Sequence, residues 1–296
     1  MRAAFPSGKR GYCEECLSGG SPRGARHTSQ GSWQSPFLTW LQLTGERHLR
    51  TGIFLGIGLL SFEQSSGLPL WLKFIPPPRS LRTPRLAEDV TIGPYAIIDG
   101  PAVIGPGSEI GAQVWIHGEV SMGAMNKVGY GSILGADPQD LAFEPATTTG
   151  VVLGEKNVLR EYVTIHRATE QERSTTIGNG NFLMTGVHLG HDVVMGDRNT
   201  LANNVLLAGF VEMGNSVVVG GGSAFHQFIR IGDLAMVGVL AGPSKDVPPY
   251  CVVRKTNRLA GLNAIGLRRG GIGPEERREI KSAYVILFQG GLALNT

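Results

Sequence analysis

The chain has 296 residues, enough for one large domain or two small ones, and 43 of them are glycine. Its net charge of +3 is unevenly distributed, because residues 1–85 hold 11 Lys and Arg against 4 Asp and Glu, whereas residues 86–296 hold 16 against 20. The overall charge therefore does not indicate a nucleic-acid-binding protein. Three cysteines argue against a disulfide framework and fit a reducing compartment.

Residues 1–82 differ in composition from the rest of the chain. They hold three of the four tryptophans and an apolar run at 52–62, which is too short to span a bilayer and too far along the chain to be a signal peptide. Cys13 and Cys16 form a single CxxC with only His27 nearby, a pattern that fits unpaired cysteines better than a zinc or redox site. We expect residues 1–82 to be a dispensable disordered extension, or a stretch upstream of the true translation start.

A six-residue repeat begins at Leu86 and organises most of the remaining chain. An apolar residue recurs at every sixth position from 86 to 134, again from 153 to 165, and without a slip from Ile177 to Val237. Glycine often follows it, and a small or branched residue stands four positions after it. Helices and alternating strands have other periods. The repeat predicts a parallel β-helix with 18 residues per coil, an apolar axis, and glycines that let the chain turn each corner.

The six-residue repeat is interrupted twice, and near the end of the chain a helical pattern replaces it. The repeat breaks at 136–150 and at 169–175, which predicts two surface loops of the kind that often frame binding sites. It stops after Tyr250, and Pro274 opens a helical pattern that runs to Phe288. The expected apolar face of this helix consists of Ile280, Tyr284, Leu287 and Phe288.

An 18-residue coil stacks residues that are 18 positions apart. His191, Gly209 and Gln227 have this spacing and are expected to form one column on an outer edge, about 10 Å from end to end. An imidazole, a bare glycine backbone and an amide in one line are a candidate site.

From about residue 84 to residue 270 the chain resembles the UDP-N-acetylglucosamine acyltransferases that open lipid A biosynthesis. The shared strings are PQDL at 138–141, TIHR at 164–167 and HLGHD at 188–192, followed by LANN, LAG, HQF, DVPPY and the GLN..GLRR string at 261–269. The resemblance implies an all-β solenoid, a left-handed parallel β-helix that is an exception to the right-handed crossover rule. It divides the chain into a catalytic β-helix at 83–250 and a shortened C-terminal helical segment at 251–296.

The same resemblance implies an activity and its partners. The expected enzyme is a cytoplasmic homotrimer that moves a 3-hydroxyacyl group from acyl carrier protein to the 3-hydroxyl of UDP-N-acetylglucosamine, with no metal and no organic cofactor. His191 would be the general base, since imidazole titrates near working pH, and Asp192 would orient it. The N–H of Gly209 would stabilise the oxyanion, a contribution of about 3–4 kcal/mol in other enzymes. As an outward-facing edge residue, His191 is expected to bury little surface; the alternative is an ordinary surface histidine.

The resemblance also implies residues that bind the nucleotide and the acyl chain. These are Gln139, Asp140, His188, Asn204, His226, Gln227, Val239, Asn263 and Arg269. Arg269 suits phosphate oxygens but is equally readable as a solvated charge, and Asn203 and Asn204 could instead form an interior amide ladder. Val239 occupies a position that limits the length of the acyl chain. His166 is expected to be structural or to lie near the site.

The chain departs from the family pattern at three positions and carries a basic cluster near its end. Ala142 stands where the family usually has lysine, Phe210 where it often has histidine, and Ile265 where glutamate is common. The basic cluster could attract the acidic acyl carrier protein, or it could be a solvated face. It consists of Arg254, Lys255, Arg258, Arg268, Arg269, Arg277, Arg278 and Lys281.

Two other classes of protein remain open on the sequence alone. His188 and His191 could bind zinc, as in the hexapeptide-fold carbonic anhydrases, although catalytic zinc needs three protein ligands and a His-x-x-His pair is a weak match. The third possibility is a catalytically silent hexapeptide scaffold, which a shortened C-terminus would suit.

Overall fold

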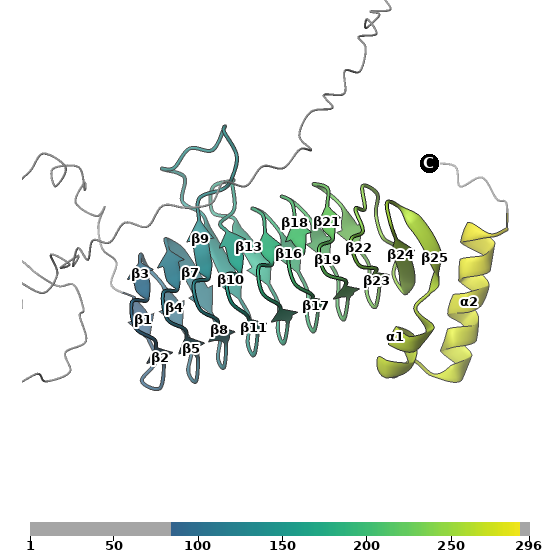
Figure 1. Ribbon diagram of the computed structural model, residues 1–296, viewed down its shortest axis with the longest axis horizontal. Coiled ribbons are helices and arrows are strands. Elements are labelled where there is room, and N and C mark those ends of the chain that lie inside the picture. The colour runs from purple at the N-terminus through teal and green to yellow at the C-terminus, as the bar shows by residue number, and fades with distance from the viewer. Residues whose placement is uncertain (1–83, 291–296) are drawn as a thin grey trace, which may run out of the picture. The chain divides into compact units, whose positions relative to one another are not determined.

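The computed structural model describes residues 84–290. These residues form a left-handed parallel β-helix, as predicted. The chain winds through short strands that form three sheets, and two helices follow the strands (Figure 1). The expectations for residues 1–82, including the Cys13–Cys16 pair, lie outside the described part of the chain. None of the helices within residues 84–290 is long and apolar enough to cross a membrane.

Each coil contributes one strand to each of three sheets. Sheet A contains β1 (Arg85–Leu86), β4 (Val103–Ile104), β7 (Glu119–Met122), β10 (Gly150–Leu153), β13 (Ser174–Ile177), β16 (Val194–Met195), β19 (Glu212–Met213) and β22 (Arg230–Ile231). Sheet B contains β2 (Thr91–Ile92), β5 (Glu109–Ile110), β8 (Lys127–Val128), β11 (Val158–Leu159), β14 (Phe182–Leu183), β17 (Thr200–Leu201), β20 (Val218–Val219), β23 (Met236–Val237), β24 (Cys251–Arg254) and β25 (Arg258–Leu262). Sheet C contains β3 (Ile97–Asp99), β6 (Trp115–His117), β9 (Ile133–Ala136), β12 (Thr164–His166), β15 (His188–Leu189), β18 (Leu206–Leu207) and β21 (Ala224–Phe225).

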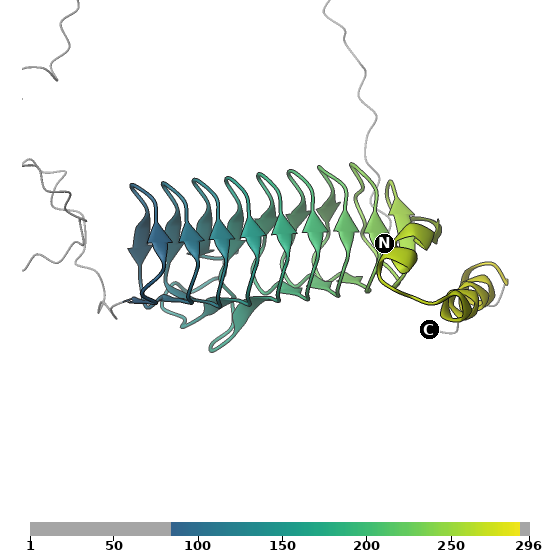
Figure 2. The same ribbon diagram turned by 90° about the horizontal axis from the view of Figure 1, so that it is seen from below.

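The strand register has the predicted 18-residue spacing. Leu189 pairs with Leu207, which pairs in turn with Phe225 in the next coil. Every apolar residue of the repeat from Ile177 to Val237 is at most 3% exposed. The small or branched residues four positions later, such as Val187 and Ala235, are also fully buried. Two of every six residues therefore fill the axis, and the coils stack as parallel rungs (Figure 2).

The glycines that follow the apolar residues have a different role from the one expected. A Cβ on Gly196 would lie only 2.8 Å from the carbonyl oxygen of Gly214 in the next coil. Close approach of neighbouring backbones therefore requires glycine there, and most of these glycines do not have positive φ. The left-handed turn falls further along each corner, often on non-glycine residues such as Asp192 (φ 60°) and Phe210 (φ 60°).

Buried asparagines line the interior of the corner between sheets A and B. The Oδ1 of Asn157 accepts hydrogen bonds from the backbone N–H and the Nδ2 of Asn181, at 2.9 and 3.0 Å, and Asn126 serves Asn157 in the same way. The ladder continues to Asn199. The suggestion that Asn203 and Asn204 form an interior ladder is wrong, because both are exposed.

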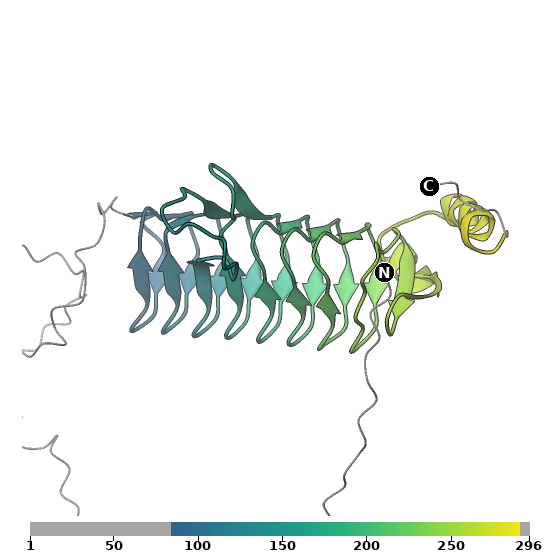
Figure 3. The same ribbon diagram turned by 90° about the horizontal axis from the view of Figure 1, so that it is seen from above.

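Two loops leave the stack at the predicted breaks in the repeat. The first connects β9 to β10 and the second connects β12 to β13. Figure 3 shows them projecting from one side of the coils. Because both follow strands of sheet C and precede strands of sheet A, they lie over the corner that joins these two sheets.

The C-terminal region begins with strands rather than with a helix. Sheet B continues through β24, which pairs in parallel with β23, and then through β25, which pairs antiparallel with β24. The sheet therefore crosses the boundary expected at residue 250. The helices are α1 (Ala264–Arg269) and α2 (Pro274–Phe288), the second with the predicted bounds. No residue of α2 is buried, and of its predicted apolar face Ile280 and Tyr284 are half-buried whereas Leu287 and Phe288 are exposed.

Candidate active site

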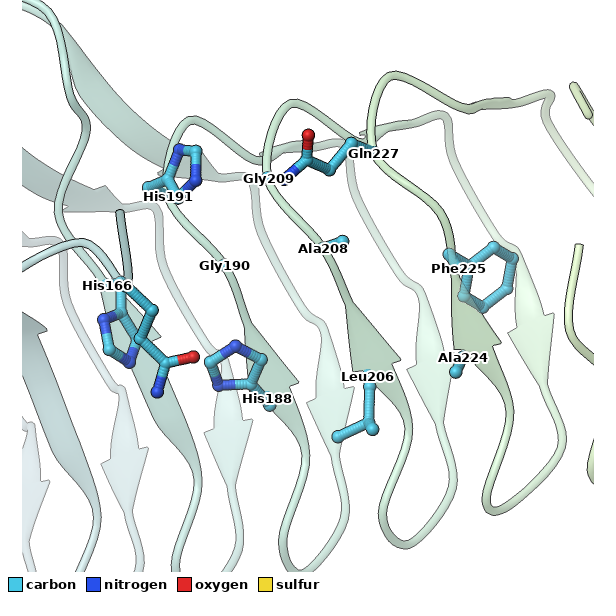
Figure 4. A pocket seen from close by; sticks show the side chains of 11 residues that line it. His166, His188, Gly190, His191, Leu206, Ala208, Gly209, Ala224, Phe225 and Gln227 are labelled. Carbon is cyan, nitrogen blue, oxygen red and sulfur yellow. The ribbon is translucent and has the colours of Figure 1, made fainter. Parts of the chain in front are cut away.

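A cavity of about 310 Å³ opens on the outer face of sheet C, beside the corner that leads into sheet A (Figure 4). Four consecutive coils, those of β12, β15, β18 and β21, and the first loop contribute to it. It is lined by Gln139, His166, His188, Gly190, His191, Leu206, Ala208, Gly209, Ala224, Phe225 and Gln227. The lining includes five residues that the sequence singled out for catalysis or substrate binding.

The predicted column of His191, Gly209 and Gln227 is present along the edge of this cavity (Figure 4). The imidazole of His191 lies against the backbone of Gly209, so that a Cβ on Gly209 would come within 2.6 Å of Nε2. Glycine is therefore required at 209 for the histidine to keep its place. The side chain of Gln227 reaches from the next coil toward Gly209.

His191 and Asp192 form a buried pair. Nδ1 of His191 lies 2.9 Å from Oδ2 of Asp192, and the two residues are 7% and 8% exposed. The ring of Phe210 packs edge-on against the imidazole, with centroids 5.2 Å apart. The expectation that His191 buries little surface is therefore wrong, because Gly209, Asp192 and Phe210 enclose the ring. An ionised carboxylate only accepts hydrogen bonds, so Nδ1 carries the proton and Nε2 is left as an acceptor.

Thr169, which the sequence did not single out, also contacts this pair. Its backbone N–H and its Oγ1 both donate to Oδ2 of Asp192, at 3.1 and 2.7 Å. Thr169 begins the second break in the repeat, and that break was the only sign in the sequence that this residue lies near the site. It showed that a loop leaves the coil there, but not that the loop returns to the Asp192 carboxylate.

The backbone N–H of Gly209 is free to bind a ligand. At the corner between sheets A and B, the equivalent N–H groups of Asn179 and Asp197 donate to side-chain oxygens of the next coil, at 2.7 and 2.8 Å. At the corner between sheets C and A the residue one coil after Gly209 is Gln227, and its side chain does not accept from Gly209, so within residues 84–290 the N–H of Gly209 has no acceptor. An unpaired donor beside His191 and the cavity can stabilise negative charge on a bound group.

Two more histidines form the other side of the cavity. The rings of His166 and His188 lie 5.1 Å apart, Nδ1 of His166 lies 2.6 Å from the carbonyl oxygen of Asp137, and Nδ1 of His188 lies 2.8 Å from Oγ1 of Thr164. Burial, with smaller contributions from His166 and His191, lowers the pKa of His188 from 6.5 to about 4. His188 is therefore neutral at pH 7 and can take part in hydrogen bonds without charge.

No group of three His, Cys, Asp or Glu side chains suited to hold a metal ion is found within residues 84–290. The pair of His188 and His191, which suggested zinc, is engaged differently. Nδ1 of His188 contacts Thr164, and Nδ1 of His191 contacts Asp192.

Arg167 holds the first loop, which brings Gln139 to the cavity. Its guanidinium binds the carboxylate of Asp137 at 2.8 Å and the carbonyl oxygens of Thr147 and Pro145 at 2.8 and 3.0 Å. It also lies over the ring of Phe143, 4.8 Å from the centroid. Asp140, the neighbour of Gln139, is exposed and does not line the cavity.

The remaining predicted binding residues are not brought together in one chain. His226 is exposed beside the cavity, whereas Asn204 and Val239 are exposed at the opposite border of sheet C, at its corner with sheet B. Asn263 is buried as the N-cap of α1, where it accepts from the N–H of Gly266 and donates to the carbonyl oxygen of Leu234. Arg269 is exposed at the end of α1.

Comparison with known proteins identifies relatives of this arrangement. A family model described as UDP N-acetylglucosamine O-acyltransferase, domain 2, matches residues 246–296, and the bacterial transferase hexapeptide model matches residues 83–118 and 174–209. An acyl-(acyl-carrier-protein)–UDP-N-acetylglucosamine O-acyltransferase of Sulfurovum sp. is 43% identical, over 71% of this chain and 80% of the relative. A protein of the same name from Gloeothece citriformis is 39% identical, over 61% of this chain and 66% of the relative.

Solved structures agree with these relatives. The UDP-N-acetylglucosamine O-acyltransferase of Moraxella catarrhalis superposes with a TM-score of 0.69 at 38% identity, over 72% of this chain and 83% of that one. The UDP-N-acetylglucosamine acyltransferase of Francisella novicida superposes with a TM-score of 0.70 at 35% identity, over 72% and 79%. Identity at this level over most of both chains, together with the shared β-helix, shows that the chain belongs to the acyl-(acyl-carrier-protein)–UDP-N-acetylglucosamine O-acyltransferase family.

Proposed function

We propose that this protein transfers a 3-hydroxyacyl group from acyl carrier protein to the 3-hydroxyl of UDP-N-acetylglucosamine, the first reaction of lipid A biosynthesis, in the cytoplasm. The observation that carries the proposal is the arrangement in the cavity. An oriented imidazole, with Nδ1 2.9 Å from a carboxylate, lies directly against the unpaired N–H-bearing backbone of Gly209. Acyl transfer to a hydroxyl needs a base and an oxyanion donor next to each other.

In the proposed reaction His191 acts as general base. Its Nε2 takes the proton of the sugar 3-hydroxyl as the oxygen attacks the thioester carbonyl carbon, and the N–H of Gly209 stabilises the resulting oxyanion. The tetrahedral intermediate then expels the thiolate of the carrier, and the imidazolium returns its proton to that sulfur. Asp192 holds the imidazole in the required tautomer throughout and stabilises its charged form.

Substrate groups would be bound around this centre. Neutral His188 and the amides of Gln139 and Gln227 line the cavity, where each is placed to bind sugar or acyl-chain polar groups. The resemblance assigns the nucleotide phosphates to Arg269, which is exposed and free to reach them. Because both polar atoms of the Asn263 side chain are engaged in capping α1, we assign Asn263 the indirect role of placing the helix that carries Arg269.

The active form is proposed to be a homotrimer. Apolar residues are exposed on the outer face of sheet C, including Ile97 (56%), Trp115 (42%) and Leu206 (45%). The cavity opens on this same face, and a single chain covers only one side of it. A neighbouring copy packed on sheet C would bury these side chains and turn the open cavity into a closed groove.

Acyl carrier protein is the proposed donor, and the basic cluster near the C-terminus supports its docking. Apart from the half-buried Arg277, the cations of this cluster are exposed. One of them, Arg278, is paired with Glu275 on α2. Attraction between these charges and an acidic carrier would raise the rate of association and would weaken with added salt.

One assay separates this function from a catalytically silent scaffold. The purified full chain is incubated with UDP-N-acetylglucosamine and a set of 3-hydroxyacyl carrier proteins of different chain length, and the 3-O-acylated sugar nucleotide is detected by mass spectrometry. Transfer that is lost in His191→Ala supports the proposed reaction. Absence of product with every donor, from a correctly assembled protein, would overturn the proposed reaction.

A further inference from the structure

The second loop, between β12 and β13, returns to the buried carboxylate of Asp192. Thr169 is half-buried at its start, and its N–H and Oγ1 lie 3.1 and 2.7 Å from Oδ2. The same oxygen lies 2.9 Å from Nδ1 of His191. One carboxylate oxygen therefore accepts three hydrogen bonds, of which the hydroxyl of Thr169 makes the shortest.

The end of this loop holds the backbone of Asp192. Asp192 has a φ of 60°, in the left-handed region that residues other than glycine adopt infrequently. Its backbone N–H donates at 2.9 Å to Oγ1 of Thr175, which is fully buried in β13. Thr169 and Thr175, on either side of the loop, thus fix the side chain and the main chain of the same residue.

The loop is itself tied to the first loop. The N–H of Glu172 donates to the carbonyl oxygen of Thr148 at 2.9 Å, and the N–H of Thr148 donates to Oε1 of Gln171 at 3.1 Å. Within the second loop, the N–H of Arg173 donates to the carbonyl oxygen of Glu170 at 3.1 Å. These bonds hold Thr169 at a defined position over the carboxylate.

We propose that Thr169 is a positioning residue of the acyl-transfer centre, an inference that rests on the proposed function. Its hydroxyl fixes Oδ2 of Asp192 in the plane where it accepts the Nδ1 proton of His191, which directs Nε2 into the cavity. Hydrogen bonds to a charged group are stronger and more directional than neutral ones, and burial strengthens them further. The break in the repeat at 169–175 therefore serves the catalytic pair, although no residue of this loop lines the cavity.

The test compares three variants of the full chain. Thr169→Val keeps the shape of the side chain and removes the hydroxyl, Thr169→Ser keeps the hydroxyl, and Thr176→Val is the control, since the Thr176 hydroxyl contacts only the carbonyl oxygen of Ser174 at 3.3 Å. Loss of a hydrogen bond to a buried charge predicts that Thr169→Val lowers kcat about tenfold to hundredfold. The KM values of both substrates should stay within about twofold, because the contact helps the reaction step rather than binding. Thr169→Ser should recover most of kcat.

A second readout does not depend on activity. Solid-state ¹⁵N NMR of histidine-labelled protein, with the His191 signals assigned by their loss in His191→Ala, should show a single tautomer protonated at Nδ1 in the wild type and a mixture in Thr169→Val. A wild type that transfers no acyl group, together with this tautomer change, would remove the proposed function and keep the positioning role. An unchanged tautomer and unchanged kcat in Thr169→Val, or an equal loss in Thr176→Val, would overturn the inference.

Discussion

The imidazole of His191 is enclosed by the backbone of Gly209, the ring of Phe210 and the carboxylate of Asp192. This enclosure gives the residue two roles, one in the proposed chemistry and one in packing. Phe210 is in turn stacked on Phe228, with ring centroids 4.8 Å apart, and Phe228 is 64% exposed. The ring of Phe210 therefore covers one edge of the imidazole and is itself covered by Phe228.

Replacing His191 should affect both activity and stability. We expect His191→Ala to abolish acyl transfer and to lower the free energy of unfolding by about 1–3 kcal/mol, because it leaves a cavity and removes one of the three hydrogen bonds to the buried carboxylate of Asp192. Urea unfolding measures the second effect, with His226→Ala as a stability control, since His226 is exposed. Activity above a few per cent of the wild type would remove His191 from the role of base, and unchanged stability would contradict its packing role.

The position of His191 could be predicted from the sequence, but its burial could not. The hexad fixes the length of the coil, so residues 18 positions apart must stack, and the column of His191, Gly209 and Gln227 followed from spacing alone. Burial depends instead on the left-handed conformation of Asp192 and on the path of the loop that starts at Thr169. Neither of these is specified by the period of the repeat.

His188 should make stability depend on pH. Its pKa is lowered to about 4 in the folded protein from 6.5, so between these values the unfolded chain binds more protons, and stability is lost as the pH falls from 6.5 toward 4. Because the side chain is partly exposed, we expect this residue to account for only about 1–2 kcal/mol of that loss. Thermal unfolding of the wild type and of His188→Gln across this range measures it. Parallel curves of stability against pH for the two proteins would show that the pKa of His188 does not differ between the folded and unfolded protein.

At the scale of the strand and its corner, the asparagine ladder stabilises the stack. Asn157 donates to Oδ1 of Asn126 and to the carbonyl oxygen of Gly178, and it accepts from Asn181. Its removal leaves several buried polar groups without partners at once. We therefore expect Asn157→Ala to lower the free energy of unfolding by about 2–4 kcal/mol.

The control for the ladder is Asn203→Ala. Asn203 is exposed, and its side chain makes no hydrogen bond within residues 84–290. Urea unfolding of this variant should match the wild type within about 0.5 kcal/mol. A similar loss in both variants would mean that the ladder adds nothing beyond the general cost of replacing an asparagine in this fold.

The position of each asparagine within the six-residue repeat explains why the sequence predicted the ladder at the wrong asparagines. Asn157, Asn181 and Asn199 each stand two residues before an apolar residue of the repeat, in the slot that valine fills elsewhere. A polar residue in an otherwise buried slot is a readable signal of an interior ladder. Asn203 and Asn204 stand after the apolar residue, where the chain turns outward.

At the scale of the whole molecule, the repeat predicted the β-helix and its two loops but not its C-terminal closure. The hexad ends near Tyr250, yet β24 and β25 extend sheet B without it, because a hairpin pairs through backbone groups that no side-chain period records. The short helix α1, capped by Asn263, was also missed. The exposed apolar residues of sheet C are the surface that a neighbouring copy would cover in the proposed homotrimer.

The proposed acyl-chain groove depends on how neighbouring subunits pack. The cavity lies at the border of sheet C with sheet A, whereas Val239 stands at the border with sheet B and is 70% exposed. Its side chain does not touch the core, since the buried apolar residue of that hexad is Val237. For Val239 to limit the chain, the groove must cross the face of sheet C and be closed by a neighbouring subunit.

Under this arrangement Val239 sets how long an acyl chain fits. Valine fills space that glycine would leave open, and each buried methylene contributes about 0.8 kcal/mol, so blocking two changes selectivity more than about tenfold. We expect the wild type to favour a shorter hydroxyacyl chain than Val239→Gly, with Val239→Ala between them. Val218→Ala is the control, because Val218 is an exposed valine on sheet B (43%), and it should leave the preference unchanged. Competing donors of different length measure it, and the same preference in all four proteins would place the limit elsewhere in the groove.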